Sequence, residues 1–74
     1  MIMAGHTLLR RARINAGLTM QQIATRAAVS RPTVDKAEKG QEPVSEVNAA
    51  RIVNALNDLA GTNYTVEDLG IVIA

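Results

Sequence analysis

Residues 19–39, TMQQIATRAAVSRPTVDKAEK, decide the fold of this chain. Thr19 is a preferred N-cap residue, and Gln22 three positions later completes the pattern of a capping box. Ser30 is a second N-cap, and Pro32 follows it at a first-turn position where a missing N–H costs little. The segment therefore predicts two short helices with a tight turn between them, at 19–27 and 30–39.

The faces of the second of these helices follow from a rotation of about 100° per residue. If Val34 points toward the core, Ala37 and Glu38 also point inward. The outward positions are mostly basic: Arg31, Pro32, Lys36 and Lys39. Two hypotheses fit this face equally well. One is a helix that enters the major groove of DNA, where Arg and Lys donate to guanine, and the other is an ordinary amphipathic helix with a solvated basic side.

Glu38 favours the first hypothesis. A carboxylate that projects inward needs a partner, because the burial of an unpaired charge is costly. Arg13, near the end of a preceding predicted helix, is the natural candidate for that partner. The alternative is that Glu38 reaches solvent at the end of its own helix. An ion pair would tie the first helix of the chain to the helix with the basic face.

Helices are also expected on both sides of the central segment. Thr7 and Gly17 delimit a first helix, and Ser45 caps a long helix whose apolar residues recur at helical spacing. The apolar positions are Leu8, Leu9, Ala12 and Ile14 in the first helix and Ala49, Ile52, Val53, Leu56, Leu59 and Ala60 in the long one. The complete prediction is an all-α, compact five-helix bundle that forms a single domain over 1–74, with helices at 7–16, 19–27, 30–39, 45–60 and 65–69 and an apolar tail at 70–74 that is either a short strand or extended.

The composition favours one small soluble domain. With 74 residues and no cysteine, the chain has room for one modest core and lacks any means of forming a disulfide or a thiolate metal site. No apolar run approaches the length of about 18 residues that a membrane span needs, and the first residues lack the pattern of a signal peptide. We therefore expect a cytoplasmic protein with no membrane partner.

The charge is distributed unevenly along the chain. Residues 1–41 carry seven basic and two acidic side chains, a net charge of +5. Residues 42–74 carry one basic and five acidic side chains, a net charge of −4. A polyanion is therefore expected to bind the first half. The simpler interpretation is that the two halves are solvated faces of opposite sign.

A longer series of residues resembles a known family. The stretch LRRARINAGLTMQQIA at 9–24 is followed by VSRPTV at 29–34, by EKG at 38–40, by Pro43 and by IVNAL at 52–56. The series looks like the phage Cro and repressor family, also called the xenobiotic-response-element type, and covers most of the chain. The resemblance implies a lambda-repressor-like helix-turn-helix fold. It also implies a small bacterial or phage transcriptional regulator, repressor-like, that binds double-stranded DNA sequence-specifically as a homodimer, with a recognition helix in the major groove.

The resemblance further implies roles for individual residues. In the family, the positions that match Arg31, Pro32, Thr33 and Lys36 face DNA bases. Those that match Thr19, Gln21, Lys39, Gly40 and Gln41 lie near phosphates. The positions that match Arg13 and Glu38 form a salt bridge inside the fold, in agreement with the pairing argued above.

Three positions depart from the family pattern. Ala28 stands in the turn where Gly is common, and a left-handed backbone there costs an L-residue about 1 kcal/mol. Met20 replaces a residue that is often polar, which removes one potential contact with DNA. Pro32 can at most meet a thymine methyl group, so base recognition is expected to depend heavily on Arg31 and Lys36.

The residues after the long helix are more apolar than a small monomer can easily cover, which is typical of an interface. In the resembling family the dimer contact also lies in this region. The predicted homodimer interface consists of Tyr64, Val66, Leu69, Ile71, Val72 and Ile73. The apolar run 71–73 has strand propensity and would pair with its symmetry mate or with residues 1–3. The alternative is that the tail folds back over its own core.

No catalytic or cofactor site is predicted. His6 is the only histidine, and neither a cysteine nor a cluster of carboxylates accompanies it. We therefore expect a protein that is not an enzyme and that uses neither a cofactor nor a metal. The alternative function is an antitoxin or adaptor module whose main ligand is another protein, a role that the acidic second half and the apolar tail would suit.

Overall fold

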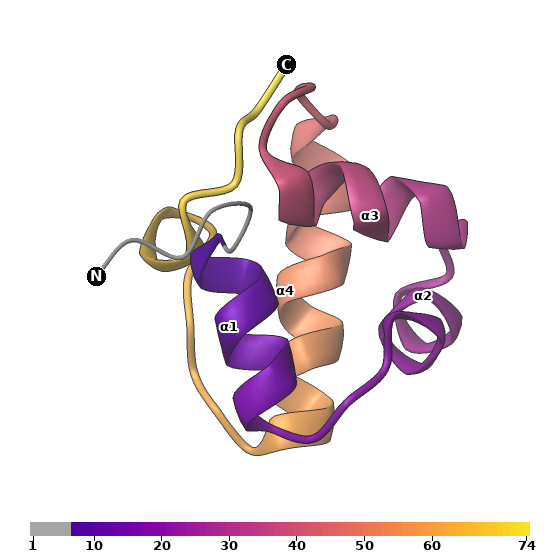
Figure 1. Cartoon of the computed structure of the whole chain (residues 1–74), viewed down its shortest axis with the longest axis vertical. Helices are drawn as coiled ribbons and strands as arrows, with labels where there is room; N and C mark the ends of the chain where they lie inside the picture. Colours follow the sequence, from indigo (N-terminus) through magenta and orange to yellow (C-terminus); the bar gives the residue numbers. More distant parts are fainter. Residues whose placement is uncertain (1–6) are drawn as a thin grey trace.

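The computed structural model describes residues 7–74. In this range the chain forms four α-helices and, near its end, a single turn of 3-10 helix. These elements are α1 (Leu8–Asn15), α2 (Met20–Ala27), α3 (Arg31–Lys39), α4 (Glu46–Ala60) and the 3-10 turn η1 (Glu67–Leu69). In Figure 1, α1 and α4 run along the long axis of the molecule and α3 crosses near one end. The long helix α4 contacts both α2 and α3.

The all-α class is confirmed, but the prediction of a fifth α-helix is wrong, and of the two alternatives for the tail the short strand does not form. At 65–69 the chain makes only the 3-10 turn η1. The turn stops at Gly70, whose backbone is left-handed with φ 63° and cannot continue a right-handed helix. The tail forms one isolated parallel bridge between Val44 and Ile73. The bridge does not lengthen into a ladder, because facing residues alternate along a strand and the next one after Val44, Glu46, already lies in α4. In the other direction the tail departs from extended backbone at Gly70, where φ is 63°.

Each α-helix begins at the residue that the sequence predicts as its N-cap. The side chains of Thr7, Ser30 and Ser45 each accept a hydrogen bond from the backbone N–H three residues later. At Thr19 the capping box is complete: Gln22 N donates to Thr19 Oγ1 over 3.1 Å, and Thr19 N donates to Gln22 Oε1 over 2.8 Å. These bonds satisfy N–H groups that the start of a helix leaves unpaired, and so they fix where each helix begins.

Ala28 is the C-cap of α2, and it has the left-handed backbone expected of the turn, with φ 59° and ψ 41°. Within residues 7–74 it is the one residue other than glycine with a positive φ. The backbone closes around it: Ala28 N donates to Thr25 O over 3.3 Å, and Val29 N donates to Ala24 O over 3.1 Å. The turn therefore keeps its left-handed geometry at the cost of strain in one alanine.

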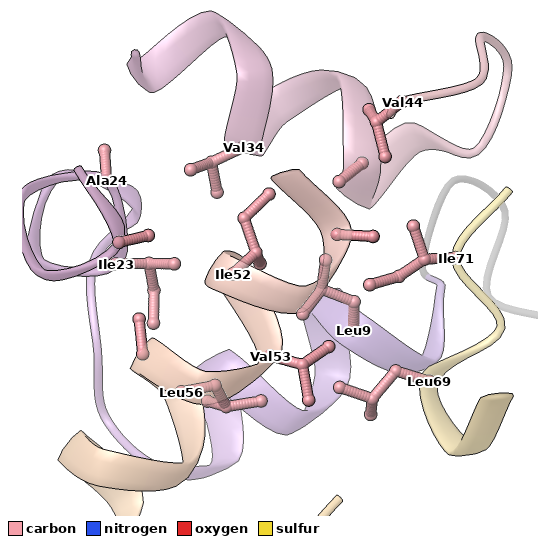
Figure 2. Close-up of a cluster of buried hydrophobic side chains, with 14 residues drawn as sticks. Leu9, Ile23, Ala24, Val34, Val44, Ile52, Val53, Leu56, Leu69 and Ile71 are labelled. Carbon is pink, nitrogen blue, oxygen red and sulfur yellow. The ribbon is translucent and has the colours of Figure 1, made fainter. Parts of the chain in front are cut away.

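The core is built around α4, which contributes the fully buried Ile52 and Leu56. Figure 2 shows Ile23 of α2 on one side of these residues, with Leu69 and Ile71 on the opposite side. The remaining labelled members of this cluster are Leu9, Ala24, Val34, Val44 and Val53. All of these side chains are aliphatic, and the cluster joins residues of α1, α2, α3 and α4 with the C-terminal tail.

Three of the apolar side chains at helical spacing lie in solvent and not in the core. Leu8, Ile14 and Leu59 are 55%, 47% and 41% exposed. In α1 the inward positions are Leu9 and, four residues on, Arg13, which is mostly buried. At about 100° per residue, Leu8 and Ile14 lie well to either side of that line. The eight residues of α1 therefore turn only the narrow stripe of Leu9 and Arg13 toward the core, and Leu8 and Ile14 remain outside it.

The C-terminal tail folds back over the core of its own chain. Leu69 and Ile71 are only 2% and 8% exposed, so these two of the residues predicted for the dimer interface are buried within their own chain. The backbone N–H and the backbone carbonyl of Val44 both bind the tail. Val44 N donates to Val72 O over 3.0 Å, and Ala74 N donates to Val44 O over 2.8 Å. The alternative interpretation of the tail, as a cover for the core, is the one that the structure supports for these two side chains.

One of the sequence predictions, the pairing of the tail with residues 1–3, falls on residues 1–6, which lie outside the described residues, as does His6. Among residues 7–74, no helix combines the length and the apolar character that crossing a membrane requires.

Candidate nucleic-acid interface

Small apolar side chains pack α2 and α3 against each other and against α4. Helix α2 buries Ile23, Ala24 and Ala27, and helix α3 buries Val34 and Ala37. Because alanine and valine add little bulk, the two helices can pack closely across the turn at 28–30. The inner face of α3 is fully used in these contacts, which leaves its outer face without a structural role in the core.

A buried ion pair fixes the same inner face to the first helix. Arg13 Nε donates to Glu38 Oε2 over 2.5 Å and Arg13 Nη2 donates to Glu38 Oε1 over 3.1 Å, while Nη1 donates to the carbonyl of Leu18 over 2.8 Å. The side chains of Arg13 and Glu38 are 11% and 2% exposed. Glu38 does not reach solvent, and its charge is compensated by a bidentate partner. The pair joins α1, the turn after α1 and the C-terminal half of α3.

The outer face of α3 lies in solvent, as the helical rotation predicts. The exposed residues on it are Arg31, Pro32, Lys36 and Lys39. Thr33 is half-buried, and its hydroxyl lies 2.8 Å from the hydroxyl of Ser30. Three of the four residues expected to face bases are therefore open, and Thr33 is engaged in the cap of its own helix.

The residues expected near phosphates fall at two places, the start of α2 and the end of α3. Thr19, Gln21, Lys39 and Gln41 are exposed, and Gly40 is half-buried. The two polar side chains of the first group already have partners within α2. Thr19 caps the helix, and Gln21 Nε2 donates to Thr25 Oγ1 over 3.0 Å.

Two acidic residues lie among these basic ones, and sequence reasoning gave neither a role. Glu42 Oε2 is 3.7 Å from Lys36 Nζ, and Asp35 Oδ2 is 3.0 Å from Lys39 Nζ. With Pro32 and Gln41, these four residues line a shallow recess of about 160 Å³. The spacing of Asp35 and Lys39 by four residues on one helix could have revealed their pair. Glu42 lies beyond the helix, where helical spacing gives no signal.

Four of the residues predicted to form an interface remain at the surface. Tyr64, Val72 and Ile73 are exposed, and Val66 is half-buried. The backbone of Tyr64 is held by Asn57, whose Nδ2 donates to Tyr64 O and whose Oδ1 accepts from Tyr64 N, both over 2.9 Å.

Two short helices joined by a tight turn, the second packed on its inner face and open on its outer face, define a helix-turn-helix protein. The family model described as a helix-turn-helix domain matches residues 7–59, and the chain belongs to that family. The match agrees with the resemblance to the Cro and repressor type, and it indicates a DNA-binding regulator. No curated protein gives a significant match to the chain, and no solved structure does.

Proposed function

We propose that this chain is a small repressor-like transcriptional regulator that binds double-stranded DNA sequence-specifically, with α3 as the recognition helix in the major groove. The observation that carries the proposal is the division of α3 into two faces. Val34, Ala37 and Glu38 are 0%, 3% and 1% exposed, whereas the opposite face is basic and open. A helix held by one face alone can insert its other face into a groove of about 12 Å width.

Base contacts are assigned to Arg31, Pro32, Thr33 and Lys36. Arg31 lies at the start of α3, the end that helix-turn-helix proteins direct at base edges, and it has the longest reach of the four. Lys36 lies on the same outer face and can donate to guanine O6 or N7. Pro32 has no donor to offer and is assigned an apolar contact with a thymine methyl group.

Phosphate contacts are assigned to Thr19, Gln21, Lys39, Gly40 and Gln41. Such contacts fix the register of a protein on the duplex and carry no sequence information themselves. Their position at the start of α2 and the end of α3 would place one contact group on either side of the groove that α3 enters. Binding needs no cofactor, and the chain acts as a single domain that pairs with a second copy through Tyr64, Val66, Val72 and Ile73.

Selection from a randomised pool of duplexes, followed by sequencing of the enriched DNA, tests the proposal. We expect one enriched site with two-fold symmetry, since a symmetric dimer reads two half-sites. The affinity for that site should fall steeply with salt because Lys and Arg release counterions from the phosphates. A pool that shows no enrichment, together with duplex affinity that is absent even at low salt, would contradict the proposal.

A second candidate is a module whose main ligand is another protein, such as an antitoxin or adaptor. The observation in its favour is the exposed Leu8, 55% accessible, which lines a recess of about 270 Å³ together with Ala12 and Tyr64. An adaptor would show little affinity for duplex DNA and would form a stable complex with its partner. Because antitoxins also bind DNA, the absence of salt-dependent duplex binding is the result that favours the adaptor.

A further inference from the structure

The surface assigned to DNA carries nearly as many acids as bases. Among the charged residues of α3 and the loop after it that face outward, Arg31, Lys36 and Lys39 are basic, and Asp35 and Glu42 are acidic, which gives a net charge of +1. Both lysines are also occupied: Lys36 Nζ lies 3.7 Å from Glu42 and Lys39 Nζ lies 3.0 Å from Asp35. A surface that only had to attract DNA would not need these carboxylates.

We propose that Asp35 and Glu42 weaken binding to DNA of arbitrary sequence, and that Glu42, through its pair with Lys36, raises the sequence specificity of α3. The proposal rests on the DNA-binding function argued above. Binding without base recognition depends on lysine and arginine that neutralise phosphates. To reach a phosphate, Lys36 or Lys39 must leave its carboxylate, which then lies unpaired beside a polyanion.

Of the two lysines only Lys36 is assigned to a base, whereas Lys39 is assigned to a phosphate and must leave Asp35 on any DNA sequence. On the matching sequence Lys36 gains a base acceptor, which offsets the loss of its carboxylate partner. Glu42 also restricts where the flexible Lys36 places its charge, and this positions the donor before DNA arrives. Glu42 is therefore a positioning residue for Lys36, and its effect is smaller on the cognate site than on other DNA.

The alternative is that these are ordinary surface ion pairs with no part in recognition. Their side chains are well exposed, at 45% and 71% for Lys36 and Glu42 and at 58% and 37% for Lys39 and Asp35. Exposed pairs of this kind contribute little to folding stability. The acids can therefore be neutralised without loss of the fold, and any change in DNA affinity can be measured on intact protein.

The experiment compares Glu42→Gln and Asp35→Asn with the unchanged chain on two duplexes, the site enriched by selection and a random sequence of equal length. We expect each substitution to tighten binding to the random duplex about two- to fivefold, the range that exposed ion pairs allow. Glu42→Gln should tighten the enriched site less, whereas Asp35→Asn should tighten both duplexes alike, because Lys39 is assigned to a phosphate on either. The slope of log affinity against log salt on the random duplex should steepen by about 0.9 for each lysine released to a phosphate. In a Lys36→Gln background, Glu42→Gln should lose most of its effect.

Glu67→Gln is the matched control, because Glu67 is exposed on η1 and its neutralisation changes the net charge of the chain equally. If Glu42→Gln and Asp35→Asn act no more strongly than Glu67→Gln, the proposal is overturned. It is also overturned if Glu42→Gln tightens both duplexes by the same factor, because specificity is then unchanged. A failure of the unchanged chain to bind any duplex is a different result, which removes the proposed function and this inference with it.

Discussion

Arg31 and Lys36 have the surroundings that base recognition needs, since both are exposed on the outer face of a helix whose inner face is buried. The basic character of these positions could be recognised from the sequence by counting rotations from Val34. The acids that pair with the lysines could not be assigned in this way, because Glu42 reaches Lys36 from a loop. Residue types thus predicted which side chains face outward, and only the three-dimensional arrangement revealed their partners.

Replacement of Arg31 tests base recognition directly. Arg31→Ala should weaken binding to the enriched site by about 1–3 kcal/mol and should weaken binding to random duplex much less. The reason is that a side chain on a base edge contributes mainly where the matching base is present. Fluorescence anisotropy on both duplexes measures the two losses. An equal loss on both would mean that Arg31 contacts phosphate only.

Ala28 offers a test of the strained turn between α2 and α3. Ala28→Gly should raise the free energy of unfolding by about 0.5–1 kcal/mol. Glycine adopts a positive φ without the penalty that alanine pays, and this gain exceeds the entropy cost of glycine's greater freedom in the unfolded chain. Urea unfolding gives the value. Ala16→Gly is the control, since Ala16 caps α1 with a right-handed backbone at φ −82° and should lose stability instead. A loss of stability in Ala28→Gly would contradict the strain argument.

At the scale of elements, the starts of the helices were the most predictable feature. Thr7, Thr19, Ser30 and Ser45 cap helices because a short hydroxyl side chain can reach the N–H three residues on, and this depends on local sequence alone. The direction of Leu8 and the extent of η1 depend instead on packing between distant segments. Local patterns therefore predicted α1 to α4 and failed for the 3-10 turn and the tail.

The contact between α1 and α3 depends on the pair of Arg13 and Glu38. Replacement of either residue alone, as Arg13→Met or Glu38→Gln, should destabilise the fold by about 3–5 kcal/mol, because one buried charge or its partner is left uncompensated. A double-mutant cycle in denaturant measures the coupling between the two sites. The exposed pair of Arg26 and Asp58, with both side chains 57% exposed, is the control and should give at most about 1 kcal/mol. Coupling of similar size in both pairs would argue against a structural role for the buried one.

At the scale of the whole molecule, the exposed part of the tail is the surface through which two copies would pair and present two α3 helices to DNA. The tail covers its own core through Leu69 and Ile71, yet Val72 and Ile73, which follow them, stay 43% and 36% exposed. Deletion of the tail would remove Ile71 from the core as well as any interface. A charged substitution at an exposed tail position separates the two effects.

Val72→Asp should therefore shift a dimer toward monomer without unfolding the chain, because the side chain of Val72 is exposed and its carbonyl still accepts from Val44 N. Sedimentation equilibrium measures the shift. Affinity for a two-fold symmetric site should fall steeply in parallel, because a dimer binds two half-sites about 34 Å apart and a monomer binds only one. Val47→Asp, at an exposed position on α4 that is not assigned to the interface, should leave both the dimer and the affinity unchanged. If Val72→Asp stays dimeric with full affinity, the two copies do not meet at the tail, and the exposed Leu8 on α1 becomes the surface to test next.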